Sequence, residues 1–595
     1  MASTLKISSI GSDETLDQSR LAAILEEQPT RVSVDEEAFG APVETISPLG
    51  YHVDWISVIF LNVSRIIGVG VFVTPATILR GVGSVGISMI YWVIGFLFSA
   101  ASLCVYLEYL CYYPQRSGGI VTYLEKAFPR PRLMAPFLYA CLFCTLSTSS
   151  AACIVFAEYV LLALQYEITK WNVRGVALGL STAMTMICIL STKWSLHFSN
   201  AIGMVKVLAL VLIAITGLIV LCGGVPHVPN PGANFSQPFL GTSNNINGLV
   251  SALLKIRFSY VGWESVFSMV NEVKDPIPTL KKFAPLSLGV VFVLYMLVNI
   301  AYFATVPLEK IKSSNEMIAN LFFETIFPSS PNSTNVALTV LQFLVALSSL
   351  GSVIAATISA SRIIRESGRQ GLLPYPQIWA STKPFNTPLA AYLLRWSVTS
   401  VLIVIPPPGD AFNFSESSLL THFFIIKVNS CIYSSLSSVV DLQYYPESIY
   451  AFLLVIGLFL VRRRRAAVGA PSVPFRAWTF VAVFALVVNL VIMIIPWVPP
   501  EGGIYAGDVS FFYATYCIAG LGVIALSCVI YYFWYVHFPR RGGYRIRQIT
   551  EKLSDGAQTS KIVKVPVEAL EEWDSAHVDD VEHLVGNEEG MRDRM

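Results

Sequence analysis

Long apolar stretches recur along the whole chain and limit it to very few folds. A membrane-spanning helix needs about 20 predominantly apolar residues, and twelve stretches reach or approach that length. Only 13% of the residues are charged, against about 25% in soluble domains. The sequence therefore predicts an all-α polytopic membrane protein with twelve transmembrane helices. The predicted spans are 52–79, 84–110, 133–164, 173–191, 199–222, 246–271, 284–305, 336–361, 388–405, 445–461, 475–496 and 510–536.

Positive charge gathers on one side of these spans. Cytoplasmic loops carry an excess of Lys and Arg, and placing the N-terminus inside also places the arginine run 462–465 and Arg540 inside. The opposite loops carry the N-x-S/T sequons of Asn234, Asn332 and Asn413, and such sequons are used only on the lumenal side. The two signals agree and predict cytosolic N- and C-termini.

The flanking segments differ from the membrane region. Residues 1–48 are polar and acid-rich and lack the apolar core of a signal peptide, so we expect a disordered cytosolic tail. Residues 49–539 form the predicted transmembrane transporter domain. Within it, 415–440 is an outer-side insertion, a re-entrant piece or a translated intron. Residues 540–595 predict a cytosolic tail, either merely solvated or a regulatory segment that controls turnover through ubiquitin-ligase machinery.

The first span is interrupted. Gly68, Gly70 and Pro75 lie inside a stretch that would otherwise form one continuous helix. In lipid, every backbone N–H and C=O needs a partner, so a break at this depth is tolerated only against other protein or a cavity. A G-x-G pair can also mark simple close packing of two helices. The break is therefore a candidate substrate site, with helix packing as the alternative.

A second interruption lies in the sixth span, at Phe258-Ser259-Tyr260-Val261-Gly262-Trp263-Glu264. The two breaks begin two successive sets of five spans, which run in opposite directions across the membrane. Interrupted helices in corresponding places of two repeats are the best indication from sequence of a transporter site. Together the breaks predict a substrate site at the centre of the membrane.

The broken backbone suits an α-amino acid. The helix dipole places partial positive charge on the N–H groups of Gly68, Val69 and Gly70, which can bind a carboxylate, and glycine allows the close approach. Carbonyls at the ends of the preceding half-helices can accept hydrogen bonds from an ammonium. These carbonyls belong to Ile66, Ile67, Phe258 and Ser259.

Charged residues inside spans are functional candidates. Lys206 lies deep in the fifth span, where a desolvated lysine can replace a bound sodium ion or exchange a proton. The alternative is that its side chain extends to the membrane surface. Glu264 directly follows the second break and is the second candidate for proton coupling, or for holding the break in shape.

Three motifs resemble one transporter family. The first-span motif Gly68–Pro75, the sixth-span motif 258–276 and the loop 113–119 resemble the amino acid–polyamine–organocation superfamily. Within it they are most similar to the L-type amino acid transporter branch and its fungal high-affinity methionine permeases. The resemblance implies a LeuT-like fold of five-plus-five inverted repeats with helices 1 and 6 broken. It also implies alternating access, with Tyr260, Gly262 and Trp263 at the substrate and the two aromatic side chains as gate or wall.

We therefore expect a secondary active transporter at the plasma membrane. It would import an L-amino acid by proton symport. The site candidates are mostly apolar and aromatic, which favours a neutral amino acid, and methionine follows from the resemblance alone. The alternatives are an exchanger, a carrier of another amine such as γ-aminobutyrate or choline, or a nutrient receptor that does not transport. No nucleophile–base set or metal-binding spacing is present, so we expect no enzyme activity, cofactor or metal site. The expected partners are the amino acid, protons and the lipid bilayer, with no nucleic acid.

Overall fold

The structure is a computed structural model. It describes residues 41–44, 46–226, 228, 230–314, 317–328, 336–404, 437–498 and 514–576. Residues 415–436 of the predicted insertion, most of the predicted N-terminal tail and the last residues of the C-terminal tail lie outside these ranges.

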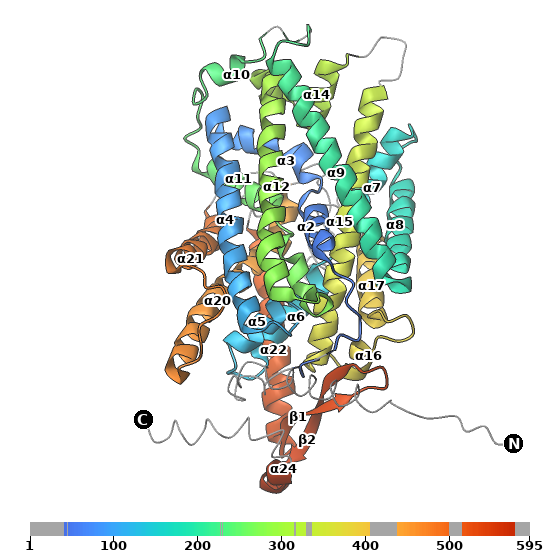
Figure 1. Cartoon of the computed structure of the whole chain (residues 1–595), viewed down its shortest axis with the longest axis vertical. Coiled ribbons are helices and arrows are strands. Elements are labelled where there is room, and N and C mark those ends of the chain that lie inside the picture. Colours follow the sequence, from blue (N-terminus) through green and yellow to red (C-terminus); the bar gives the residue numbers. More distant parts are fainter. Residues whose placement is uncertain are drawn as a thin grey trace, which may run out of the picture.

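The described chain is mostly helical (Figure 1). Up to the second break the helices are α2 (Trp55–Ile66), α3 (Gly70–Val82), α4 (Val85–Tyr112), α5 (Ile120–Ala127), α6 (Met134–Leu146), α7 (Ser150–Ala163), α8 (Lys170–Leu190), α9 (Thr192–Leu221), α10 (Ala233–Ser236) and α11 (Ile246–Ser259). Next come η2 (Trp263–Glu272), α12 (Pro276–Thr305), α13 (Leu308–Ser313), α14 (Ile318–Ile326), α15 (Val336–Arg369), α16 (Pro376–Ala380) and α17 (Leu389–Val404). The last helices of the bundle are α20 (Ser437–Val468), α21 (Thr479–Ile494), η3 (Ile495–Trp497), α22 (Thr515–Tyr531), η4 (Tyr532–His537) and α23 (Phe538–Arg541). The tail adds β1 (Tyr544–Lys552), β2 (Gln558–Pro566), η5 (Val567–Ala569) and α24 (Leu570–Ala576).

The helices confirm a polytopic membrane protein. Within the described ranges, nine helices are long and apolar enough to cross a membrane, and α2 with α3 makes a tenth candidate that is bent by 46°. The shorter helix α17 is also apolar. The chain is therefore an integral membrane protein.

The first predicted break is present. Asp54 caps α2 by accepting a hydrogen bond from Ser57 N at 2.8 Å. Helix α2 ends at Ile66, and Ile67 leaves the helical region with ψ of 88°. Helix α3 begins at Gly70, so Ile67, Gly68 and Val69 connect two half-helices.

The second predicted break is present as well. Helix α11 ends at Ser259, and Gly262 adopts φ of 122°, a conformation that residues with a side chain rarely adopt. The chain continues beyond Gly262 as the 3-10 helix η2. The change of direction is thus fixed at a glycine.

Two spans differ from their predicted form. The third consists of α6 and α7, separated at Ser147–Ser149. The eighth, α15, continues past its predicted end at residue 361 to Arg369. This extension is charged: Arg365 and Arg369 pair with Glu44 of the N-terminal tail, and Arg369 also donates a hydrogen bond to Gln558 O of the C-terminal tail.

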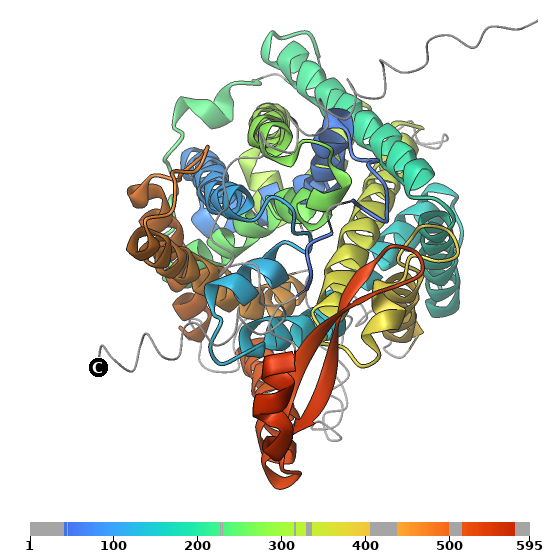
Figure 2. The same cartoon turned by 60° about the horizontal axis from the view of Figure 1, so that its bottom comes forward.

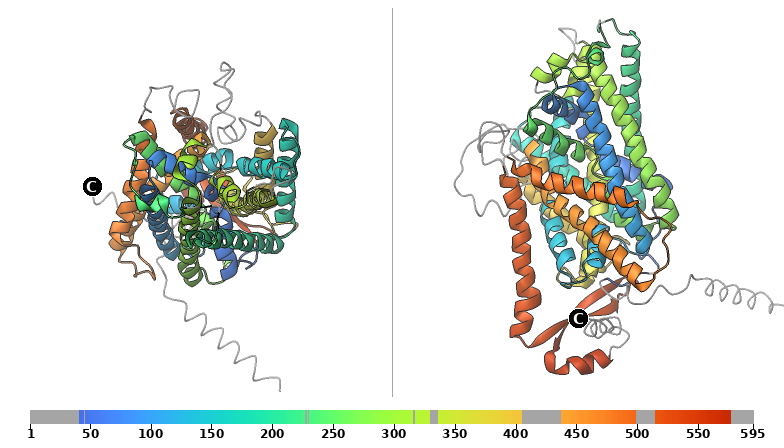
Figure 3. Two further views of the ribbon diagram at one scale, coloured as in Figure 1. Left: turned by 90° about the horizontal axis from the view of Figure 1, so that it is seen from above. Right: turned by 90° about the vertical axis from the view of Figure 1, so that its left-hand side faces the viewer.

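The helices pack into two adjoining apolar clusters. The larger surrounds α2, where α9, α12 and α15 all contact it. The smaller joins α6 to α20 and α22. Figure 3 shows α20, α21 and α22 together on one side of the bundle.

The tail corrects the expectation of an all-helical chain. Strands β1 and β2 form an antiparallel hairpin in which Ile549 faces Lys561. The hairpin contacts α15 and α16 and crosses one end of the bundle (Figure 2). We call this end the hairpin end. The strands pair along their whole length, from Tyr544 opposite Pro566 to Lys552 opposite Gln558.

Candidate functional site

Lys206 on α9 lies at the first break. Its side chain is buried, and Nζ donates hydrogen bonds to Ser64 O at 2.7 Å and Ile67 O at 2.6 Å. A third contact, at 3.3 Å, joins Nζ to Ser352 Oγ. The ammonium therefore binds the carbonyl end of α2, and its side chain does not extend to the membrane surface.

Two serines of α15 complete this carbonyl cluster. Ser348 Oγ lies 3.2 Å from Ile67 O and 3.1 Å from Gly68 O. Ser352 Oγ donates to Ser64 O at 3.1 Å. Gly351 lies between the two serines, and a Cβ there would come within 2.8 Å of Lys206 Nζ. The lysine and the two hydroxyls together satisfy the carbonyls of the unwound backbone, as burial requires, and the glycine leaves room for the lysine side chain.

Of the four carbonyls expected to bind a substrate ammonium, the two at the first break have partners within the protein. Ile67 O accepts from Lys206, and Ile66 O accepts from Tyr295 Oη at 3.0 Å and from Gly68 N at 2.9 Å. In the part of the chain that the structure describes, the N–H groups of Val69 and Gly70 make no hydrogen bond to another backbone carbonyl. The first break thus offers donors to a ligand, whereas its acceptors are used.

Direct contacts join the two breaks. Thr74 Oγ1 on α3 lies 2.9 Å from Ser259 Oγ at the end of α11. A Cβ on Gly70 would lie 3.7 Å from the same serine oxygen. The predicted residues Gly70, Phe258 and Ser259 are therefore neighbours in space, although they lie far apart in the chain.

At the second break, Arg65 and Glu264 hold Gly262. Glu264 Oε2 accepts a hydrogen bond from Gly262 N at 3.0 Å. A Cβ on Gly262 would overlap the Arg65 side chain. Glu264 thus caps the break, which matches the structural role considered for it from the sequence.

A cavity of about 150 Å³ lies beside the second break. Its charged lining residues are Arg65, Arg257, Glu264 and Glu447. Its aromatic lining residues are Phe98, Tyr106, Tyr139, Phe143 and Trp263. The lining thus contains two basic and two acidic side chains. We call this space the central chamber.

The chamber includes some of the predicted site residues and leaves others aside. Trp263 and Glu264 line it, whereas Gly68, Val69 and Gly70 are not part of its lining. Tyr260 is fully buried elsewhere, where its hydroxyl donates to Trp92 O at 3.2 Å and its ring packs on Tyr295. Ile67 lines a separate small space of about 10 Å³ next to Lys206, room for about one water molecule.

Most residues that line the chamber were not predicted from the sequence. Glu447 was not singled out, although an ionisable residue inside a predicted span is a functional candidate. Arg257 was visible in the sixth span but had no assigned role. Tyr106 and Tyr139 carry no sequence signal of their own, because aromatic residues are common in membrane helices. Only packing brings these side chains to Trp263, whose ring centroid lies 5.0 Å from that of Tyr106.

Buried ion pairs close the hairpin end below the chamber. Arg362 on α15 binds both carboxylate oxygens of Glu272 at the end of η2, at 2.7 and 3.0 Å. Arg116, after α4, contacts Glu366 at 3.3 Å. Ser117 Oγ accepts a hydrogen bond from Asn271 N at 3.0 Å. These contacts tie α15 and the loop after α4 to the end of η2.

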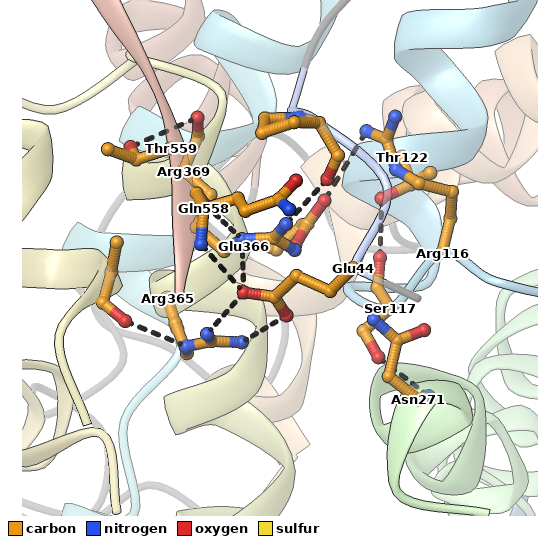
Figure 4. A network of polar contacts seen from close by, with 12 residues as sticks. Glu44, Arg116, Ser117, Thr122, Asn271, Arg365, Glu366, Arg369, Gln558 and Thr559 are labelled. Atoms are coloured by element: carbon orange, nitrogen blue, oxygen red, sulfur yellow. Dashed lines mark hydrogen bonds and ion pairs between the residues drawn. The ribbon is translucent and has the colours of Figure 1, made fainter. Parts of the chain in front are cut away.

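Glu44 connects both tails to α15 (Figure 4). Its carboxylate lies 2.9 Å from Arg365 and 3.4 Å from Arg369, and it accepts a hydrogen bond from Gln558 N of β2 at 3.2 Å. Burial acts to raise the pKa of Glu44, but the two arginines and the hydrogen bonds outweigh it, so the pKa lies below its ordinary value of 4.5. Residues 41–44 are thus held in place, although they fall within the segment predicted to be a disordered tail.

Comparison with known proteins agrees with this arrangement. The family model for amino acid permeases matches residues 53–524, which include both breaks, Lys206 and the whole central chamber. The chain belongs to the amino acid permease family. This permease is therefore an integral membrane transporter rather than an enzyme.

Individual relatives cover most of the permease. It is 33% identical to the high-affinity methionine permease of Saccharomyces cerevisiae over 514 residues, which make up 86% of this chain and 83% of the relative. It is 27% identical to the low-affinity methionine permease of the same yeast over 87% of this chain and 89% of the relative. It is 25% identical to the b(0,+)-type amino acid transporter 1 of Rattus norvegicus over 89% and 97%.

Proposed function

We propose that this permease imports a neutral, zwitterionic L-amino acid, with methionine as the foremost candidate. The main support for the proposal is the pair of helix breaks. A hydrogen bond joins them, and they lie beside the central chamber, whose lining contains equal numbers of basic and acidic side chains. Carboxylate and ammonium groups can both find partners there, and the protein supplies no net charge that would favour an acidic or basic side chain. The aromatic lining suits a thioether, because sulfur packs favourably against aromatic rings.

The fold is proposed to be the LeuT-like arrangement of twelve spans. The nine long helices and the bent pair α2–α3 account for ten, and α17 and the broken pair α11–η2 would supply the other two. The breaks then begin two inverted repeats of five spans. We assign the hairpin end to the cytosol, because Lys and Arg of the loops gather there, and the membrane to the plasma membrane. The tails would serve recognition by ubiquitin-ligase machinery.

Alternating access would require contacts at the hairpin end to break. Opening the hairpin end would require η2 to move from α15, and therefore the Arg362–Glu272 pair to break. The same movement would disturb Glu44 and Arg365. Because these ion pairs are intact, we propose that the described conformation is closed toward the cytosol.

Lys206 is the proposed coupling residue. Its ammonium binds the same carbonyl cluster that would bind a cation at this break. Losing its proton would weaken the hold on Ile67 O and allow the break to change shape. Glu264 is the second candidate, because its carboxylate binds Gly262 N at the other break.

The decisive experiment is uptake of radiolabelled methionine by cells that lack their own permeases and express this chain. We expect saturable uptake that other neutral amino acids inhibit and that a protonophore abolishes. If uptake persists after the proton gradient is collapsed but requires amino acid inside the cell, the protein is an exchanger and not a proton symporter. Inhibition by γ-aminobutyrate or choline as strong as by methionine would refute recognition of an α-carboxylate. Undiminished uptake by Gly70→Leu would refute the substrate site itself.

A further inference from the structure

A second and larger cavity lies at the hairpin end, away from the central chamber. It has a volume of about 510 Å³. Its walls come from α6, α22, η4, the segment 371–377 and β2, and include Phe137, Leu373, Ile530, Trp534, Lys561 and Ile562. Most of these side chains are apolar, and the hairpin supplies the one lysine among the lining residues that the structure describes. Nothing in the proposed transport cycle uses this space.

The cavity lies at the depth where a membrane surface would cross α22. Exposed apolar residues on this helix, such as Val529 and Ile530, are followed by the exposed aromatic residues Tyr532 and Phe533. Exposed arginines come next, at positions 540 and 541. Such an order marks the boundary between hydrocarbon and headgroups. Trp534, which lines the cavity, falls within this aromatic belt.

The adjoining face of the hairpin is basic. Side chains alternate between the two faces of a strand, and the pairing Ile549–Lys561, Arg547–Val563 and Arg545–Val565 places Arg545, Arg547 and Lys561 on one face. This face adjoins the cavity through Lys561, which is one of the lining residues.

Among the residues that the structure describes, few acidic groups lie on this face. Glu551 shares it and lies 3.9 Å from Lys561, with both side chains well exposed, and such surface pairs bind weakly. The acidic residues of α24 lie farther from the transmembrane helices, at the bottom of Figure 1. Within the described ranges, this face of the hairpin therefore carries more basic than acidic side chains.

We propose that this cavity binds one anionic phospholipid from the leaflet at the hairpin end. An acyl chain would lie against Ile530, Trp534 and Ile562, and the headgroup phosphate would lie at Lys561. Juxtamembrane basic residues attract acidic lipids of the cytoplasmic leaflet, and here they lie beside an apolar cavity that a chain can enter. The lipid would join the hairpin to α22. Transport is not part of this argument, so a failure of the proposed function would leave it intact.

The test uses the purified full-length protein, in detergent, with phosphatidylserine and phosphatidylcholine at equal concentration. Native mass spectrometry counts the lipids that stay bound. We expect one retained phosphatidylserine, preferred over phosphatidylcholine. Lys561→Ala should lower that preference about five-fold, which is the effect of about one surface charge. The matched control is Lys564→Ala, on the same strand but outside the lining of the cavity, beside Tyr544, and it should behave as wild type.

Ile562→Trp provides a second variant that leaves every charge in place and fills the cavity. It should lose the retained lipid while keeping the monodisperse elution of the wild type. Equal retention of both lipids by the wild type would overturn the proposal, since it would indicate ordinary surrounding lipid. Equal losses in Lys561→Ala and Lys564→Ala would overturn it too, since they would indicate a diffuse basic surface. Retention unchanged by Ile562→Trp would exclude the cavity as the place of binding.

Discussion

Replacing Gly262 by alanine should damage the second break more than a single methyl group suggests. At φ of 122° the backbone is in a region that residues with a side chain enter at a cost of about 1–3 kcal/mol. The added Cβ would also overlap the Arg65 side chain, and overpacking of this kind costs about 1–3 kcal/mol. We expect Gly262→Ala to lose about 3 kcal/mol of stability and most uptake, because Arg65 and Glu264 both line the chamber.

Two other glycines serve as matched controls. Gly289 lies within α12, and a Cβ there would meet nothing within 4 Å. Alanine at this position should be neutral or stabilise the helix by up to about 1 kcal/mol. At Gly70 a Cβ would make only ordinary contacts, the nearest at 3.7 Å. Gly70→Ala should therefore keep its thermal stability and still lose uptake, because the methyl group obstructs the approach of a carboxylate to the backbone N–H.

The assay combines the thermal stability of the detergent-solubilised protein, followed by size-exclusion chromatography after heating, with methionine uptake at matched surface expression. We expect a clear order of thermal stability, in which Gly262→Ala is lowest and Gly70→Ala and Gly289→Ala match the wild type. A Gly262→Ala protein as stable as Gly289→Ala would refute the strain argument. Wild-type uptake by Gly70→Ala would refute the close approach at the first break.

Three further predictions concern other parts of the molecule. Lys206→Ala removes the donor to Ser64 O and Ile67 O and should abolish proton-driven uptake, so full uptake at every pH would exclude a coupling role. The charge of Glu44 stabilises the fold above pH 4.5, because its folded pKa is lowered, and this contribution disappears as the pH falls through the folded pKa. The melting temperature of the wild type should exceed that of Glu44→Gln near pH 6, and the gap should close below pH 4.5; a constant gap would contradict the ion pairing with Arg365. Asn234 Nδ2 donates to Phe303 O and Val306 O at 2.7 and 2.8 Å, so Asn234→Gln should not change the glycosidase-sensitive mobility of the protein on gels.

Features that depend on a short stretch of chain could be predicted from the sequence. The break at Gly68–Gly70 and the break near Gly262 were both expected, because a glycine that interrupts an apolar run acts on its own backbone. Lys206 was identified for the same kind of reason, as a charge inside a span. The same reasoning did not predict that Ile66 O and Ile67 O are already hydrogen-bonded, since their partners, Tyr295 and Lys206, come from other helices.

The structure of the two tails, in contrast, could not be predicted from the sequence. The polar composition of residues 1–48 and 540–595 predicted solvated segments, yet Glu44 and the hairpin dock on the end of α15. A carboxylate, two arginines and a strand edge each look like ordinary surface groups in the sequence. Only their meeting at one place makes a buried network.

The sequence by itself determined the membrane class, the positions of most spans and the two interruptions, because apolar length, Gly and Pro act locally. The tertiary structure alone decided how these pieces meet. It places Lys206 at the carbonyl end of α2 and brings Arg257 and Glu447 into one chamber with Trp263. It also places Glu44 of the N-terminal tail between α15 and the hairpin. The physical reason is that hydrogen bonds and ion pairs form within about 3 Å, whereas their partners here lie tens to hundreds of residues apart. No pattern along the chain encodes such a distance until the helices have packed.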